Sequence, residues 1–178
     1  MENRTPGAGG SSRWSWFFFW AGSVAALVTL LWPKQAGEKL GQTLPLEESV
    51  RTVGGEEIPF AELLEARTLV HFYASWCPPC RVELPRLITF LESAKGKGLN
   101  LVLVAVADAP ELAEQMVPES WRSRIVLDPD WRLAHAFGTR KLPETHLLLH
   151  FRIVEQFIGA ASWDDPAVQQ RVLERLRS

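Results

Sequence analysis

The stretch ASWCPPC at residues 74–80 decides how this sequence folds and which chemistry it carries. It holds the only two cysteines among 178 residues. A β-rich run ends there and a helical pattern begins, which is the context that gives a Cys-x-x-Cys pair redox meaning. Cys77 falls at the predicted helix N-terminus, where free backbone N–H groups and the helix dipole favour the thiolate. We therefore predict that Cys77 is the nucleophile and that the more enclosed Cys80 resolves its mixed disulfides.

Outward from this pair, strand-like and helix-like patterns alternate along the chain. Residues 100–107 form a nearly continuous apolar run, which is typical of a strand buried on both faces. We predict strands over residues 68–74, 100–107, 145–149 and 153–158, and helices over residues 80–93, 110–116, 131–137 and 164–177. This alternation indicates an α/β fold in which helices cover a central sheet.

Three further motifs carry a family resemblance. They are RVELP at residues 81–85, LDPD at 127–130 and LPET at 142–145. Together with the cysteine pair, they make residues 46–178 resemble the thioredoxin superfamily, and within it the membrane-anchored TlpA/ResA-like thiol-disulfide oxidoreductases, which include cytochrome c maturation thioredoxins. The resemblance implies a thioredoxin-like fold, with a central mixed sheet flanked by helices. It also implies that Pro143 is a cis-proline packed against the active-site disulfide, the alternative being a proline at the entry to a strand. Between the last two predicted strands, LHFR at 149–152 is shorter than the family's turn and lacks its Gly.

Glu83, His71 and Trp76 complete the predicted site. Glu83 lies three residues after Cys80 on the same helix face, and the resemblance implies an acid near the disulfide that tunes cysteine reactivity. His71 stands where TlpA/ResA-like proteins usually have Asn and thioredoxin has a buried acid. Since imidazole takes a proton near neutral pH, His71 is a second candidate proton acceptor beneath Cys80, the alternative being a buried neutral histidine with one hydrogen bond. Trp76 directly precedes the nucleophile.

The residues between the cysteines bear on the direction of electron flow. Pro78 and Pro79 have no backbone N–H, so neither can donate a hydrogen bond to the Cys77 thiolate. A less stabilised thiolate favours a reductase over a strongly oxidising enzyme. Two alternatives remain at this point: a disulfide-forming oxidase that uses the same residues, and a non-catalytic module that binds polypeptides and keeps the pair as a structural disulfide.

The residues before 46 predict a membrane anchor. Residues 1–13 are polar and read as a disordered tail, and residues 33–45 read as a linker. Residues 14–32 carry no charge, and a helix of that length would span roughly 28 Å, close to the roughly 30 Å hydrocarbon core of a bilayer. The alternative is a cleavable signal peptide, whose apolar region is usually only about 7 to 15 residues long. Because disulfides persist outside the cytoplasm, we predict a single-pass protein of the inner or cytoplasmic membrane with a periplasmic or extracytoplasmic catalytic domain.

Charge and composition narrow the partners. Nineteen Lys and Arg against 21 Asp and Glu give a net charge of −2, which disfavours nucleic-acid binding. Two cysteines exclude a dense disulfide scaffold and a four-cysteine zinc site, and the histidines are scattered. We therefore expect no cofactor beyond the Cys77–Cys80 disulfide. The expected partners are protein disulfides, apocytochrome c among them, and a membrane thiol-disulfide electron donor, because cytoplasmic thioredoxin cannot cross the bilayer.

Overall fold

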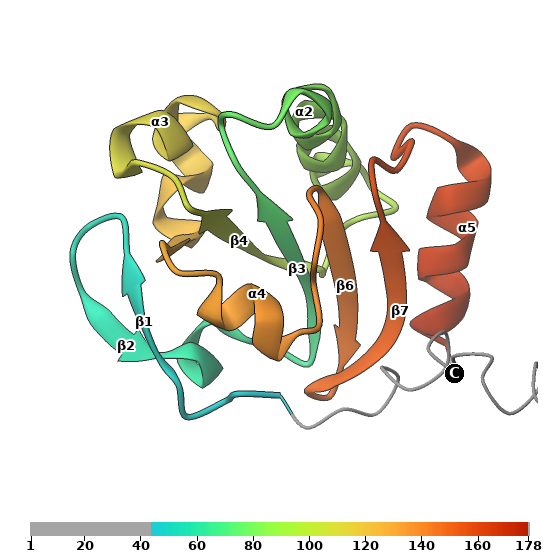
Figure 1. Ribbon diagram of the computed structural model, residues 1–178. Helices are drawn as coiled ribbons and strands as arrows, with labels where there is room; N and C mark the ends of the chain where they lie inside the picture. The colour runs from blue at the N-terminus through green and yellow to red at the C-terminus, as the bar shows by residue number, and fades with distance from the viewer. Residues whose placement is uncertain (1–43, 178) are drawn as a thin grey trace, which may run out of the picture. The chain divides into compact units, whose positions relative to one another are not determined.

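A seven-stranded mixed sheet in the order β2-β1-β5-β4-β3-β6-β7 organises residues 44–177, the part of the chain that the computed structural model describes (Figure 1). Its strands are β1 Ser49–Thr52, β2 Glu57–Pro59, β3 Arg67–Tyr73, β4 Asn100–Val106, β5 Ile125–Asp128, β6 Glu144–Leu149 and β7 Arg152–Ile158. The α-helices are α2 Pro78–Glu92, α3 Pro110–Gln115, α4 Arg132–Ala136 and α5 Pro166–Arg175, with 3-10 turns η1 Phe60–Leu63 and η2 Glu119–Arg124. The central strands β3, β4 and β5 are parallel, whereas β1, β6 and β7 join them in antiparallel pairs.

Each face of the sheet has its own hydrophobic cluster. Leu69 and Tyr73 of β3 pack with residues of α2 and α5 on one face, and Cys80 belongs to this cluster. Val70 and Phe72 point to the opposite face, where they pack against α4 and η1. This alternation follows from the two-residue period of a strand, and it places His71 on the face that α2 covers. All seven residues of β4 are buried, as expected of a strand covered on both faces.

The predicted elements are confirmed with shifts of one or two residues at their ends, within the range over which helix and strand boundaries ordinarily vary. Strands β1, β2 and β5 and both 3-10 turns were not predicted. The predicted membrane span at residues 14–32, the tail before it and most of the linker lie outside the described residues. Within residues 44–177, no helix is both long enough and apolar enough to cross a membrane.

The turn between β6 and β7 closes without glycine. Strands β6 and β7 are joined by only His150 and Phe151, whose φ angles are +47° and +64°. Two residues with positive φ make the kind of turn that matches the twist of a hairpin and usually contains Asn-Gly. The backbone N–H of His150 donates to the Ala66 carbonyl at 2.8 Å and ties the turn to the start of β3. The connection that lacks the family's Gly is therefore still a tight hairpin.

Candidate active site

Cys77 and Cys80 form a disulfide at the N-terminus of α2, with their Cα atoms 5.3 Å apart. Cys77 is the N-cap of the helix, and Pro78 and Pro79 are its first residues. Prolines fit there because the first N–H groups of a helix have no partner within it. The backbone N–H of Arg81 donates to the Cys77 carbonyl at 3.3 Å and closes the first turn. Cys77 retains 4% of its surface and Cys80 none, which agrees with an outer nucleophile and an inner resolving thiol.

A carboxylate that the sequence did not point to holds the loop before Cys77. Asp108 follows the end of β4 and accepts hydrogen bonds from the Ser75 backbone N–H and, at 2.7 Å, from the Ser75 hydroxyl. Beside it, Trp76 donates its indole N–H to the Ala107 carbonyl at 3.0 Å while its ring stays 53% exposed. The loop that carries the nucleophile is thus fixed to the end of the neighbouring strand. The only sequence signal is an Asp directly after a fully buried strand.

Glu83 is buried beneath the disulfide, with 2% of its surface exposed. Its Oε1 accepts a hydrogen bond at 2.6 Å from Nε1 of the fully buried Trp163, and its Oε2 has no hydrogen-bond partner among the described residues. Burial raises the pKa of Glu83 to about 7, against the opposing effects of the Trp163 indole and the Ala161 backbone. Glu83 therefore exchanges protons in the neutral range. Trp163 was missed because it lies 80 residues away in the sequence.

His71 is fully buried on the same face of the sheet. Its Nδ1 lies 2.8 Å from the Thr145 hydroxyl, and its ring stacks on Tyr73 with centroids 6.0 Å apart. Within residues 44–177, its Nε2 has no hydrogen-bond partner. Burial lowers the pKa of His71 to about 3, so the imidazole is neutral throughout the physiological range. A base this weak does not hold a proton at neutral pH. The directions of the two pKa shifts thus differ: burial keeps His71 neutral and brings the pKa of Glu83 into the neutral range.

The register of the sheet places Pro143 next to the loop that carries the disulfide. Glu144 pairs with Phe72 in the antiparallel β6–β3 ladder, so the residue before Glu144 lies beside the end of β3, where that loop begins. The Leu142–Pro143 peptide bond is cis, as predicted, and the Pro143 carbonyl accepts from the Gly159 N–H at 2.9 Å.

Behind Pro143, a buried polar network occupies the face covered by α4. Glu144 lies 3.2 Å from Nε2 of His146 and accepts from the Gln156 side chain, and Thr139 lies 2.9 Å from the same imidazole nitrogen. All but Gln156 are buried. His146 is one of the scattered histidines that did not suggest a metal site. Its contacts with Thr139 and Glu144 support the strand that follows Pro143.

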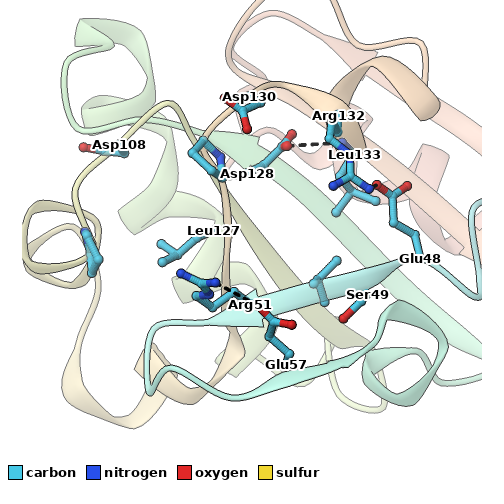
Figure 2. A pocket seen from close by; sticks show the side chains of 13 residues that line it. Glu48, Ser49, Arg51, Glu57, Asp108, Leu127, Asp128, Asp130, Arg132 and Leu133 are labelled. Atoms are coloured by element: carbon cyan, nitrogen blue, oxygen red, sulfur yellow. Dashed lines mark hydrogen bonds and ion pairs between the residues drawn. The ribbon is translucent and has the colours of Figure 1, made fainter.

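One cavity beside the sheet contains neither cysteine. It has a volume of about 470 Å³ and lies between β1, β5 and the start of α4 (Figure 2). Several of its charged side chains have partners: Arg51 pairs with Glu57 at 2.8 Å, and Asp128 accepts from the Leu133 and Ala134 backbone N–H groups. The cavity reaches the active-site loop only through Asp108. Within residues 44–177, no group of three acidic, His or Cys side chains is placed to hold a metal ion.

The sequence is similar to a known family and to several curated proteins. The profile of the AhpC/TSA family matches residues 40–157. Sporulation thiol-disulfide oxidoreductase A of Bacillus subtilis is 30% identical over 119 residues, which cover 64% of this chain and 70% of the relative. Thiol:disulfide interchange protein HelX of Rhodobacter capsulatus is 36% identical over 99 residues (53% and 54%). Thiol-disulfide oxidoreductase ResA of Halalkalibacterium halodurans is 32% identical over 108 residues (59% and 61%). The chain thus spans between about half and 70% of the length of these relatives.

Solved structures share the fold. A secreted disulfide oxidoreductase of Mycobacterium tuberculosis superposes with a TM-score of 0.61 at 18% identity, covering 78% of this chain and 99% of that one. StoA of Bacillus subtilis superposes with a TM-score of 0.54 at 24% identity, covering 72% and 97%. At these identities the likeness establishes a thioredoxin-like α/β architecture for the described residues.

Proposed function

Because the chain belongs to the AhpC/TSA family of thioredoxin-like proteins, we propose that it is a thiol-disulfide oxidoreductase that reduces disulfides of partner proteins. The observation that carries the proposal is the Cys77–Cys80 disulfide at the N-terminus of α2, in which Cys77 keeps 4% of its surface and Cys80 none. A purely structural disulfide has no need of a titratable carboxyl beneath it, and Glu83 supplies one.

The cycle begins with the reduced pair. The Cys77 thiolate attacks one sulfur of a partner disulfide, the partner S–S bond breaks, and the displaced partner thiolate takes a proton from water. Cys80 then passes its proton to the Glu83 carboxylate and attacks the Cys77 sulfur of the mixed disulfide. The partner leaves with both cysteines reduced, and Cys77–Cys80 is the disulfide that the structure contains. A thiol donor must return two electrons before the next turnover.

The direction of electron flow follows from the helix start. Pro78 and Pro79 are the first two residues of α2 and bring no N–H to the Cys77 sulfur, so the first helical N–H is that of Cys80. A thiolate with fewer donors is less stabilised, and a less stabilised thiolate makes the reduced form a stronger reductant. This supports a reductase over an oxidase.

We further propose an extracytoplasmic location, with residues 14–32 as a single membrane anchor, a membrane thiol-disulfide donor, and cytochrome c maturation as the setting. The support is the uncharged run in the sequence and the persistence of disulfides outside the cytoplasm. Extraction of membranes with alkaline carbonate tests the anchor: the full-length chain should remain in the pellet, and a chain with two Arg inserted in residues 14–32 should be released. Release of both would contradict the proposal.

The function itself is tested with the full-length chain and the variants Cys77→Ala and Cys80→Ala. The Cys80→Ala chain should accumulate a mixed disulfide with a partner, whereas the Cys77→Ala chain should accumulate none. Equilibration with glutathione buffers, read by alkylation of the only two cysteines, gives the potential. A value near or below thioredoxin's roughly −270 mV supports the reductase, and a value near DsbA's roughly −120 mV would mean an oxidase. If Cys77 and Cys80 do not interconvert reversibly between dithiol and disulfide, the result favours the alternative of a non-catalytic module that binds polypeptides.

A further inference from the structure

Three exposed cations belong to the two segments that meet at the disulfide, and none of them pairs with a carboxylate of residues 44–177. Arg81 directly follows Cys80, and Arg140 and Lys141 lead into the cis-proline segment; all three are exposed. None of them forms an ion pair with another of the described residues. Both segments that meet at the disulfide, the start of α2 and the chain before Pro143, therefore carry exposed positive charge, although the whole chain carries a net charge of −2.

The acidic side chains nearby are already engaged. Asp108 is occupied by Ser75, and the buried Glu144 by His146 and Gln156. On the loop after β7, Asp164 lies 3.6 Å from Arg86, and Asp165 accepts from the Ala167 N–H to cap α5. Among residues 44–177, no carboxylate pairs with Arg140 or Lys141, so both charges are open to a partner polypeptide.

Two exposed apolar side chains border the same segments. Trp76 is 53% exposed beside Cys77, and Ile158 is 55% exposed at the end of β7, opposite Glu144 in the ladder. Gly159, which follows Ile158, donates its N–H to the Pro143 carbonyl, so Ile158 directly precedes a residue bound to the cis-proline. A partner segment that reaches Cys77 can therefore make an apolar contact with Trp76, and Ile158 offers a second one at the end of β7.

The backbone before Pro143 decides where the charges of such a segment would lie. Residues 141–143 form a bend directly before β6. A partner segment whose cysteine is at Cys77 and which runs past this bend comes within reach of the long, exposed side chains of Lys141 and Arg140. A carboxylate within about three residues of the partner cysteine would therefore meet a cation.

From this arrangement we infer that the site selects partner polypeptides that carry Asp or Glu within three residues of the cysteine it attacks, on the side that runs along Arg140 and Lys141. The inference rests on the proposed thiol-disulfide exchange and names its substrate class. Charge complementarity acts mainly on the rate of encounter and on the choice of partner.

The test uses the reduced full-length chain and seven-residue peptides whose central cysteine is joined by a disulfide to 2-thiopyridine. Attack by the Cys77 thiolate on the peptide sulfur forms Cys77–S–S–peptide and releases pyridine-2-thione, whose absorbance gives the second-order rate constant. Asp, Asn or Lys stands two residues before or two residues after the cysteine. Each rate is divided by the rate of the same peptide with dithiothreitol, which removes intrinsic differences in reactivity.

We expect one of the two Asp peptides to react about three- to fivefold faster than its Asn counterpart at low salt, and the matching Lys peptide to react more slowly. The advantage should fade toward unity at about 0.5 M salt, because exposed charges are screened. The double variant Arg140→Gln, Lys141→Gln should remove the preference, and the double variant Arg140→Glu, Lys141→Glu should transfer it to the Lys peptide.

The matched control is Arg67→Gln, Lys97→Gln, which removes two exposed cations at the opposite end of β3 and β4. It should keep the wild-type ratio of Asp to Asn peptide. Equal rates for Asp and Asn peptides in the wild type, or a preference that survives in both variants at 140 and 141, would overturn the inference alone. If no peptide reacts with the reduced chain, the proposed exchange activity fails as well.

Discussion

The Glu83→Gln substitution should change how the stability of the oxidised protein depends on pH. Burial raises the pKa of Glu83 from its ordinary 4.5 to about 7 in the native state. Between these pH values the unfolded chain has lost a proton that the native protein keeps, so the free energy of unfolding falls as pH rises. At about 1.36 kcal/mol for each pH unit, this loss amounts to about 3 kcal/mol by pH 7 and stays constant above it. Gln keeps the size of the side chain and does not ionise, so it removes the loss.

The assay is urea unfolding of the wild type and the Glu83→Gln protein, both with the disulfide intact, at several pH values from 4.5 to 8. The informative quantity is the free energy of unfolding of the variant minus that of the wild type, because other titrating groups are common to both proteins. This difference should rise by about 3 kcal/mol across the range, which corresponds to a relative gain on the order of 10 °C in Tm.

Glu92→Gln is the matched control, since Glu92 lies on the same helix and also accepts an indole hydrogen bond, from Trp121 at 3.0 Å, but is exposed. Its difference curve should be flat between pH 4.5 and 8. A flat curve for Glu83→Gln would refute the reasoning, because it would mean that Glu83 titrates alike in the folded and unfolded chain. Its proposed role as proton acceptor at neutral pH would then lose its basis.

Three further substitutions test the surroundings of the disulfide. Burial lowers the pKa of His71 from 6.5 to about 3, so as pH falls between these values the unfolded chain gains a proton that the native protein does not. The free energy of unfolding of the wild type should therefore fall by about 5 kcal/mol over this range, and His71→Asn should remove this loss. Urea unfolding that changes with pH in the same way for both proteins would contradict this. Asp108→Asn should cost about 1–3 kcal/mol by loosening Ser75, measured by thermal unfolding beside Asp130→Asn, which lines the same cavity. Asp128→Asn removes one of the two carboxylate acceptors for the first turn of α4. The free energy of unfolding should fall by about 1 kcal/mol, and the backbone amides of α4 should exchange hydrogen faster. Unchanged exchange would show that the cap is dispensable.

The parts of the fold that the sequence predicts are those with long periodic patterns. Strand β4 and helix α2 are 7 and 15 residues long, and each has a pattern that local reasoning can follow. Strands β1, β2 and β5 are only four, three and four residues long, too short for alternation to be visible. They form because the sheet provides partners: β1 pairs with both β2 and β5.

The candidate site divides in the same way. Cys77 caps the helix that carries Cys80 and Glu83, so the local sequence alone brings the three together. The groups that position them are far away in the sequence: Asp108 lies 33 residues from Ser75, and Trp163 lies 80 residues from Glu83. No local pattern connects residues at such distances, because only the folded sheet brings the ends of its strands and loops together. The sequence therefore identifies the reacting groups, and the structure identifies what holds them.

Burial has opposite effects on the two ionisable groups beneath the disulfide, and this decides which of them can take part in proton transfer. It lowers the pKa of His71 and raises the pKa of Glu83, so between about pH 3 and pH 7 both side chains are mostly uncharged. A neutral imidazole with a pKa of about 3 cannot keep a proton from Cys80 at neutral pH, whatever its position. Glu83, with a pKa of about 7, exists in both forms at that pH, and proton transfer is most efficient when the pKa of the group is close to the pH. The burial that encloses Cys80 also raises the pKa of Glu83, its neighbour on the helix, and this shift is the basis of the proposed transfer of the Cys80 proton to Glu83.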